Sequence, residues 1–124
     1  MTVLVRGNVY VYHCRWIIPP HDKIAICVCN NRNWVLWFNT KAAFHGLGQL
    51  AVGKADHPNA ITRDCFLDLS AVKGSSPQEL IDAAKNDRGP MSATLKEKIL
   101  NALQTPIPLL PDFQRSVILE CLQD

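Results

Sequence analysis

The chain has 124 residues, a length that suits one domain with a sizeable core and is too short for two. Its residues are 48% hydrophobic and 19% charged, which excludes a disordered polar chain and is usual for a globular protein. The net charge is only +2, but residues 1–40 carry Arg6, Arg15, Lys23 and Arg32 against Asp22 alone. This uneven charge is a weak indication of an anionic partner such as RNA.

Apolar runs and cysteines exclude two further classes of protein. No apolar run approaches the ~20 residues of a membrane-spanning helix, and the first residues resemble a strand more than a signal peptide. We therefore expect a cytoplasmic protein with no membrane contact. The five cysteines lack the regular spacing of a disulfide framework or a zinc site. We expect them to be buried thiols, and we expect no metal and no cofactor.

The first predicted strand covers residues 3–14, with a bend or bulge at Gly7-Asn8. His13 alternates with valines, so it is expected to be a core or interface residue. The following segment, 15–22, is predicted to be a loop because its paired prolines remove two ladder donors.

Two apolar runs around a polar turn dominate the next part of the chain. Residues 23–30 and 33–40 predict a β-hairpin, since Asn30-Asn31-Arg32-Asn33 suits a tight turn. Neither run alternates cleanly, so both faces of each strand carry apolar side chains. The hairpin should therefore lie at the centre of a sheet, with one face on the core and the other covered.

A second subunit could cover the outer face of this hairpin, which leads us to expect a homodimer. The alternative is that the C-terminal helices of the same chain cover it. The sequence leaves both arrangements open.

Strands are also predicted at residues 49–54 and 61–69, separated by a turn-rich segment that holds His57. An exposed loop position is the default for His57. In a regular strand, Arg63 and Asp64 would point to opposite faces.

The pattern then becomes helical, with helices predicted at 77–86, 92–103 and 112–122. Ser76 and Glu79 form a capping box, and Ser92 caps the second helix. The chain is thus predicted to be an α+β fold in a single domain, residues 1–124, with strands in 1–70 and helices in 71–124.

Several short motifs recur in an order that is similar to the PemK/MazF toxins of toxin–antitoxin systems. They are the opening Arg6-Gly7-Asn8-Val9-Tyr10, Lys23 before one hairpin strand, Thr40 after the other, Arg63-Asp64, Arg88-Gly89-x-Met91-Ser92, and Ile99-Leu100-x-Ala102-Leu103. The resemblance implies a small, strongly curved antiparallel β-barrel with C-terminal helices. It also implies a homodimeric, metal-independent endoribonuclease of bacterial or phage origin, with single-stranded RNA and a cognate antitoxin as partners.

RNA cleavage through the 2′-hydroxyl needs a base, an acid and a cation near the phosphate. By resemblance, Lys23 and Thr40 take the positions of the family's arginine and hydroxyl residue. Lysine keeps the charge but loses the bidentate fork of arginine. We expect Lys23 to hold the phosphate, Thr40 to orient the scissile group, His21 to carry the proton, and Arg63 to join them around one groove.

The loop from Trp16 to Asp22 is expected to form a wall of this groove. RNA contacts are predicted for Arg15, Trp16, Lys41 and Asp64, with Trp16 stacking on a base.

Two other functions remain open at this point. One is a binding module on the same fold that holds nucleic acid or a peptide without cleaving it, which the lysine at position 23 favours. The other is an interaction or regulatory protein that recruits a partner through a strand face. Lys23 itself can equally be a flanking charge that ends an apolar run.

Overall fold

The computed structural model describes residues 4–14, 17, 19–42, 46–57, 61 and 63–123. The predicted RNA contacts Arg15 and Trp16 lie outside these ranges.

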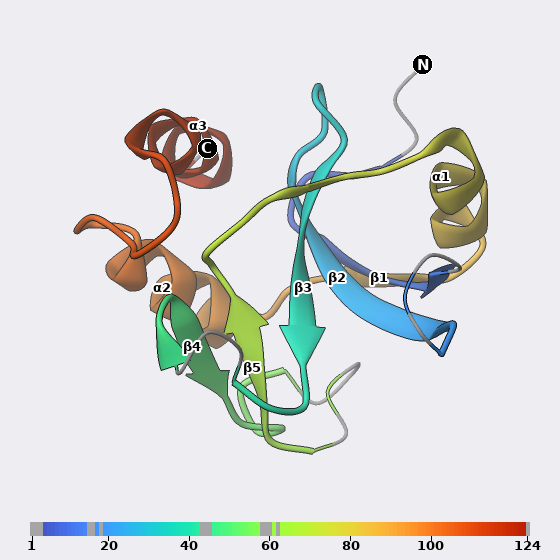
Figure 1. Cartoon of the computed structure of the whole chain (residues 1–124), viewed down its shortest axis with the longest axis horizontal. Helices are drawn as coiled ribbons and strands as arrows, with labels where there is room; N and C mark the ends of the chain where they lie inside the picture. Colours follow the sequence, from blue (N-terminus) through green and yellow to red (C-terminus); the bar gives the residue numbers. More distant parts are fainter. Residues whose placement is uncertain are drawn as a thin grey trace.

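The described residues form an α+β fold with a seven-stranded antiparallel sheet and three helices (Figure 1). The strands are β1 (Asn8–Cys14), β2 (His21–Cys29), β3 (Trp34–Asn39), β4 (Gln49–Val52), β5 (Cys65–Asp68), β6 (Lys73–Gly74) and β7 (Asp87–Pro90). The helices are α1 (Pro77–Ala84), α2 (Ala93–Ala102) and α3 (Asp112–Gln123). The α+β class is confirmed, and each helix lies within two residues of its predicted bounds.

The β2–β3 hairpin lies in the middle of the strand order, β4-β5-β3-β2-β1-β7, as predicted. The turn between its strands contains Asn33 at a φ of 54°, a left-handed conformation that asparagine tolerates better than most residues. Side chains of β2 and β3 alternate between two separate hydrophobic clusters, one on each face of the sheet.

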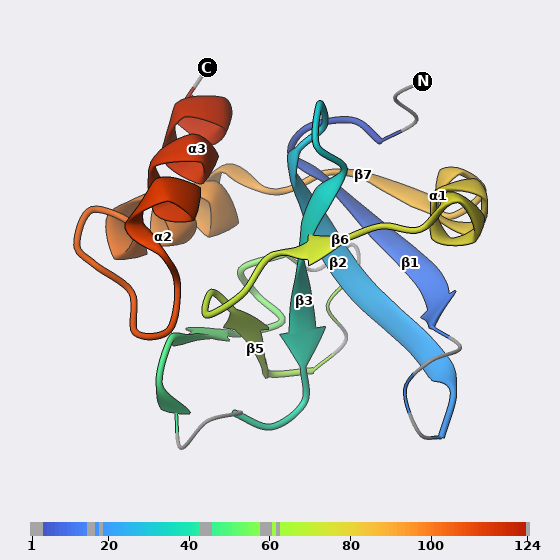
Figure 2. The same ribbon diagram turned by 45° about the horizontal axis from the view of Figure 1, so that its top comes forward.

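Helices of the same chain cover both faces of the hairpin. Figures 1 and 2 show α2 and α3 on one side of the sheet and α1 on the other. The larger cluster joins Ile26, Val28, Leu36 and Phe38 of the hairpin to Leu95, Ile99 and Ile118 of the helices. The smaller cluster joins Ala25, Cys27, Val35 and Trp37 to Tyr10, Tyr12 and Ala83. We expected a homodimer because a second subunit could cover the outer face of the hairpin. Both faces are covered by the chain's own helices.

The expectation of a closed barrel is wrong, because the sheet remains open. Within the described residues, β4 and β7 are the two ends of the strand order and do not pair with each other. Strand β3 divides its pairing: Trp34 and Val35 pair with β6, and Phe38 and Asn39 pair with β5. Residues of α2 and α3 pack against one face of this open sheet.

Strands β6 and β7 were not predicted from the sequence. Tyr10 of β1 pairs with Asp87 of β7, and the Asn8 side-chain amide donates to both oxygens of the Asp87 carboxylate, at 3.0 and 3.1 Å. Gly89 and Pro90 had indicated a break between helices. Here they form part of a short edge strand, where a proline without an N–H is tolerated.

Two further expectations need correction. Strand β5 begins at Cys65, so Arg63 and Asp64 precede the strand and do not lie on its opposite faces. His13 is exposed and not in the core: its Nδ1 lies 3.0 Å from a carboxylate oxygen of Asp22.

The cysteines agree with the prediction of buried thiols at four of the five positions, Cys14, Cys27, Cys29 and Cys65, while Cys121 is half-buried. Burial raises the pKa of the Cys27 thiol to about 12. None of the described helices combines the length and the hydrophobicity needed to cross a bilayer.

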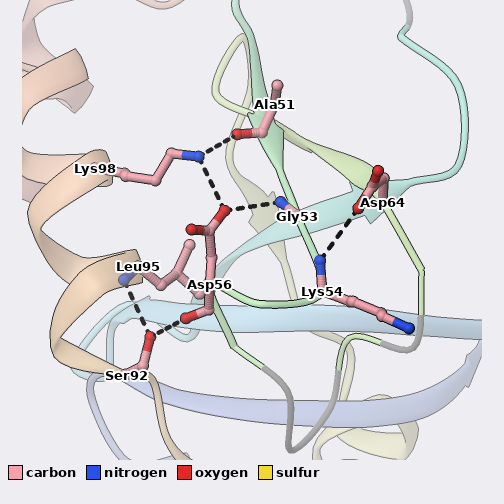
Figure 3. A network of polar contacts seen from close by, with 8 residues as sticks. All are labelled: Ala51, Gly53, Lys54, Asp56, Asp64, Ser92, Leu95 and Lys98. Atoms are coloured by element: carbon pink, nitrogen blue, oxygen red, sulfur yellow. Dashed lines mark hydrogen bonds and ion pairs between the residues drawn. The ribbon is translucent and has the colours of Figure 1, made fainter.

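His57, expected in an exposed loop, is 2% exposed and supports the start of α2. Its Nδ1 accepts a hydrogen bond from the backbone N–H of Ser92 at 3.0 Å, so the ring proton of the neutral imidazole is on Nε2. Ser92 is the N-cap of α2: its Oγ accepts from the Leu95 N–H at 3.1 Å and donates to the Asp56 carbonyl (Figure 3). The segment before His57 is thereby fastened to the helix.

An ion pair between Asp56 and Lys98 completes this network, with 2.9 Å between Oδ2 and Nζ (Figure 3). The same oxygen accepts from the Gly53 N–H at 2.7 Å. The Lys98 contact and this backbone bond hold the pKa of the Asp56 carboxyl below its usual value. The network therefore connects the end of β4 to α2.

The buried His57 makes stability depend on pH. Burial disfavours the imidazolium and lowers the pKa of His57 from its usual 6.5. Because the unfolded chain binds the proton more readily, the free energy of unfolding should fall as pH drops below about 6.5, by at most about 1.4 kcal/mol per pH unit. His57→Asn keeps an acceptor for Ser92 but does not titrate, so its unfolding free energy should be flatter between pH 7 and 5. Urea titrations at several pH values measure this, with exposed His13→Asn as the control. Equal slopes for the wild type and His57→Asn would contradict it.

Candidate functional site

A pocket of about 600 Å³ opens where β2 begins and β3 ends. Antiparallel pairing brings these two strand ends to one edge of the sheet. The segment before β5 closes another side. The polar lining residues are His21, Asp22, Lys23, Asn39, Thr40, Lys41 and Arg63, and the apolar ones are Ile24, Phe38, Ile61 and Cys65.

The pocket lining contains Lys23, Thr40 and Arg63, which were predicted to gather around one groove, and also His21 and Lys41. Asp64 is not part of the lining. Its Oδ1 accepts from the backbone N–H of Lys54 at 3.3 Å, which positions the segment before β5 (Figure 3).

His21 is the side chain in the pocket with the most suitable geometry for proton transfer. It is exposed, and its Nδ1 lies 2.8 Å from the carbonyl oxygen of Pro19. A carbonyl can only accept, so Nδ1 carries the proton and the Nε2 of the neutral ring presents its lone pair. This tautomer makes His21 a base at Nε2.

Lys41 and Arg63 supply the exposed positive charge of the pocket, and Thr40 supplies an exposed hydroxyl. Within the described part of the chain, neither basic side chain forms an ion pair. The one carboxylate of the lining, Asp22, contacts His13. The accessible part of the pocket therefore has the electrostatic character of an anion-binding site.

Lys23 differs from the expected phosphate ligand because its side chain is buried, with 9% of the residue exposed. Its Nζ donates to Oδ1 of Asn39 at 2.7 Å and lies 4.9 Å from the centre of the Trp37 ring. Burial, which removes water from the ammonium, is the main cause of the lowered pKa of Lys23. Lys73 lies 5.0 Å from the same ring and lowers this pKa further by charge repulsion. The Lys23 ammonium is therefore engaged within the protein.

Asn39 is the residue of the site that the sequence did not indicate, because an asparagine at the end of a strand is unremarkable. The register of the hairpin would have indicated Asn39. Ala25 pairs with Trp37, so two residues earlier in β2 and two residues later in β3 Lys23 lies beside Asn39. Such a count requires the register of the hairpin, which the sequence alone does not define.

The pocket can therefore bind an anion through Lys41 and Arg63 and exchange a proton through His21. The described residues contain no cluster of three or more His, Cys, Asp or Glu side chains arranged to hold a metal ion.

No protein-family model matches the chain, and a comparison with curated proteins finds no match either. The resemblance to PemK/MazF toxins stays a prediction.

The burial of Lys23 predicts an effect on stability. Lys23→Met shortens the side chain by one heavy atom and removes a charge that burial disfavours, so the unfolding free energy at pH 7 should stay equal or rise by up to about 1 kcal/mol. The lowered pKa means that wild-type folding is favoured as pH rises toward 10.5, so the difference should shrink there. Thermal unfolding at pH 7 and 9.5 measures both effects. A loss of more than about 2 kcal/mol at pH 7 would show that the Lys23–Asn39 bond stabilises the hairpin more than charge burial costs.

Proposed function

We propose that this protein is a metal-independent endoribonuclease that cleaves single-stranded RNA in this pocket, as the cytoplasmic toxin of a toxin–antitoxin pair. The observation that carries the proposal is the shared location of a basic imidazole nitrogen, two exposed cations and a hydroxyl. His21, Lys41, Arg63 and Thr40 come from three segments of the chain and line one pocket.

The chemistry assigned to these groups is transfer of the phosphodiester to the neighbouring 2′-oxygen. Nε2 of His21 removes the proton of the 2′-hydroxyl as the oxygen attacks phosphorus. The bond from phosphorus to the 5′-oxygen breaks, the 5′-oxygen takes a proton from water, and a 2′,3′-cyclic phosphate remains. The imidazolium of His21 then returns its proton to the resulting hydroxide, which restores the neutral ring. Arg63 and Lys41 stabilise the charge on the phosphoryl oxygens, and the Thr40 hydroxyl orients the phosphate.

A binding module without cleavage is the second candidate, and the position of Lys23 favours it. The lysine that takes the place of the family's arginine bonds to Asn39, and 9% of this residue is exposed. In that case Lys41 and Arg63 hold the RNA backbone and no bond is cut.

The antitoxin and the second copy of the chain belong to the proposal through the family resemblance alone. A homodimer needs a surface other than the faces of the β2–β3 hairpin, which the chain's own helices cover. Sedimentation at micromolar concentration separates a dimer from a monomer.

Cleavage of a labelled single-stranded RNA in EDTA tests the enzyme directly. We expect 2′,3′-cyclic phosphate ends, a loss of rate of about 10²–10⁴-fold in His21→Ala, and about 10²–10³-fold in Arg63→Ala. Lys85→Ala removes an exposed charge at the end of α1, far along the chain from the pocket residues, and should cleave like the wild type.

The same samples separate the two candidates. RNA that binds but stays intact, with weaker binding in Arg63→Ala and unchanged binding in Lys85→Ala, would support the binding module. If the RNA is neither bound nor cleaved, both candidate functions are excluded.

A further inference from the structure

Lys23 determines which end of the Asn39 amide faces it. A lysine ammonium carries only donors, so the atom of Asn39 that lies 2.7 Å from Nζ must be the amide oxygen. The two ends of an asparagine amide are otherwise hard to distinguish, but a donor-only neighbour settles the orientation. The Asn39 NH₂ group is therefore turned away from Lys23.

The surroundings of Lys23 keep this bond in place. The Trp37 ring, 8% exposed, lies on one side of the ammonium and is itself fixed, since its Nε1–H donates to the Tyr12 hydroxyl at 2.5 Å. The Lys73 ammonium lies 5.0 Å from the centre of the same ring and repels Lys23. Lys23 is thus held against the amide oxygen.

Asn39 is half-buried and lines the pocket, and its NH₂ has no acceptor among the described residues. We propose that this NH₂ group donates a hydrogen bond to an oxygen of RNA bound in the pocket, and that Lys23 is the positioning residue that keeps the NH₂ available. The inference rests on the RNA binding of the proposed function, and it makes Asn39 a ligand-binding residue.

A neutral donor gives the pocket a directional contact that its cations lack. Lys41 attracts any nearby anion as a point charge, whereas an amide N–H favours an acceptor along its axis. Two parts of RNA carry oxygens that accept such a bond: the sugar–phosphate backbone and the carbonyl groups of the bases.

Asn39→Asp separates a donor role from a structural one. Aspartate keeps an oxygen for Lys23 and adds an ion pair, so the melting temperature should not fall. It also replaces the NH₂ with a second oxygen that repels RNA. We expect the affinity for oligouridylate to fall by about tenfold or more. Asn31→Asp makes the same change of charge at an exposed position of the hairpin turn and should bind within about twofold of the wild type.

Comparison with oligoadenylate identifies the acceptor, because adenine has no carbonyl oxygen. In Asn39→Ala, which removes the NH₂ without adding charge, an equal loss for both oligonucleotides assigns the NH₂ to an oxygen of the sugar–phosphate backbone. A loss confined to oligouridylate assigns it to a base carbonyl. Lys23→Met frees the amide to turn and should also weaken binding. Wild-type affinity in Asn39→Asp and in Asn39→Ala would overturn the inference.

Failure of the proposed function gives a different result. If the wild type binds RNA without cutting it, the ribonuclease is excluded and the role of Asn39 stands or falls on the binding data. If the wild type binds no RNA, inorganic pyrophosphate replaces it as the probe, with the Asn39 side-chain NH₂ followed by NMR. A shift of that resonance on titration would support the donor role, and an unshifted resonance would overturn it.

Discussion

The need to bury both faces of the β2–β3 hairpin governs this structure. From Ala25 to Cys29, every residue of β2 is buried, although neighbouring side chains point to opposite faces. If either face were left uncovered, a row of apolar side chains would be in contact with water. The chain meets this requirement with three helices placed on two sides of one sheet, α2 and α3 on one and α1 on the other.

Features that depend on nearby residues could be predicted from the sequence. The capping box of Ser76 and Glu79 forms as expected, with 2.9 and 3.2 Å for its two bonds, and Ser92 caps α2. Strands β6 and β7 could not be predicted, because β6 has two residues and β7 ends in Gly89-Pro90. They exist through pairing with distant partners, Val35 and Tyr10, so the signal lies in the tertiary structure.

The candidate site likewise has one feature that could be predicted from the sequence and one that could not. An antiparallel hairpin with one strand starting near His21 and the other ending near Thr40 must bring these residues together, so their proximity could be predicted. The surroundings of Lys23 include the Trp37 ring and the charge of Lys73, which belongs to the unpredicted strand β6. The sequence therefore indicated which residues meet, and only the packing around them defines which polar atoms remain available to a ligand.

The short strand β7 has a consequence for the behaviour of the protein in concentrated solution. An open sheet has edges, and an unpaired edge can add strands from other molecules until fibres form. Here the β7 edge is four residues long and consists of Asp87, Arg88, Gly89 and Pro90, so it offers charged side chains and one position without an N–H. At the opposite edge, the Lys98 ammonium donates a hydrogen bond to the carbonyl oxygen of Ala51 in β4, at 2.8 Å (Figure 3). This oxygen is therefore already paired. Strands β4 and β7 are thus poorly suited to pair with strands of other molecules.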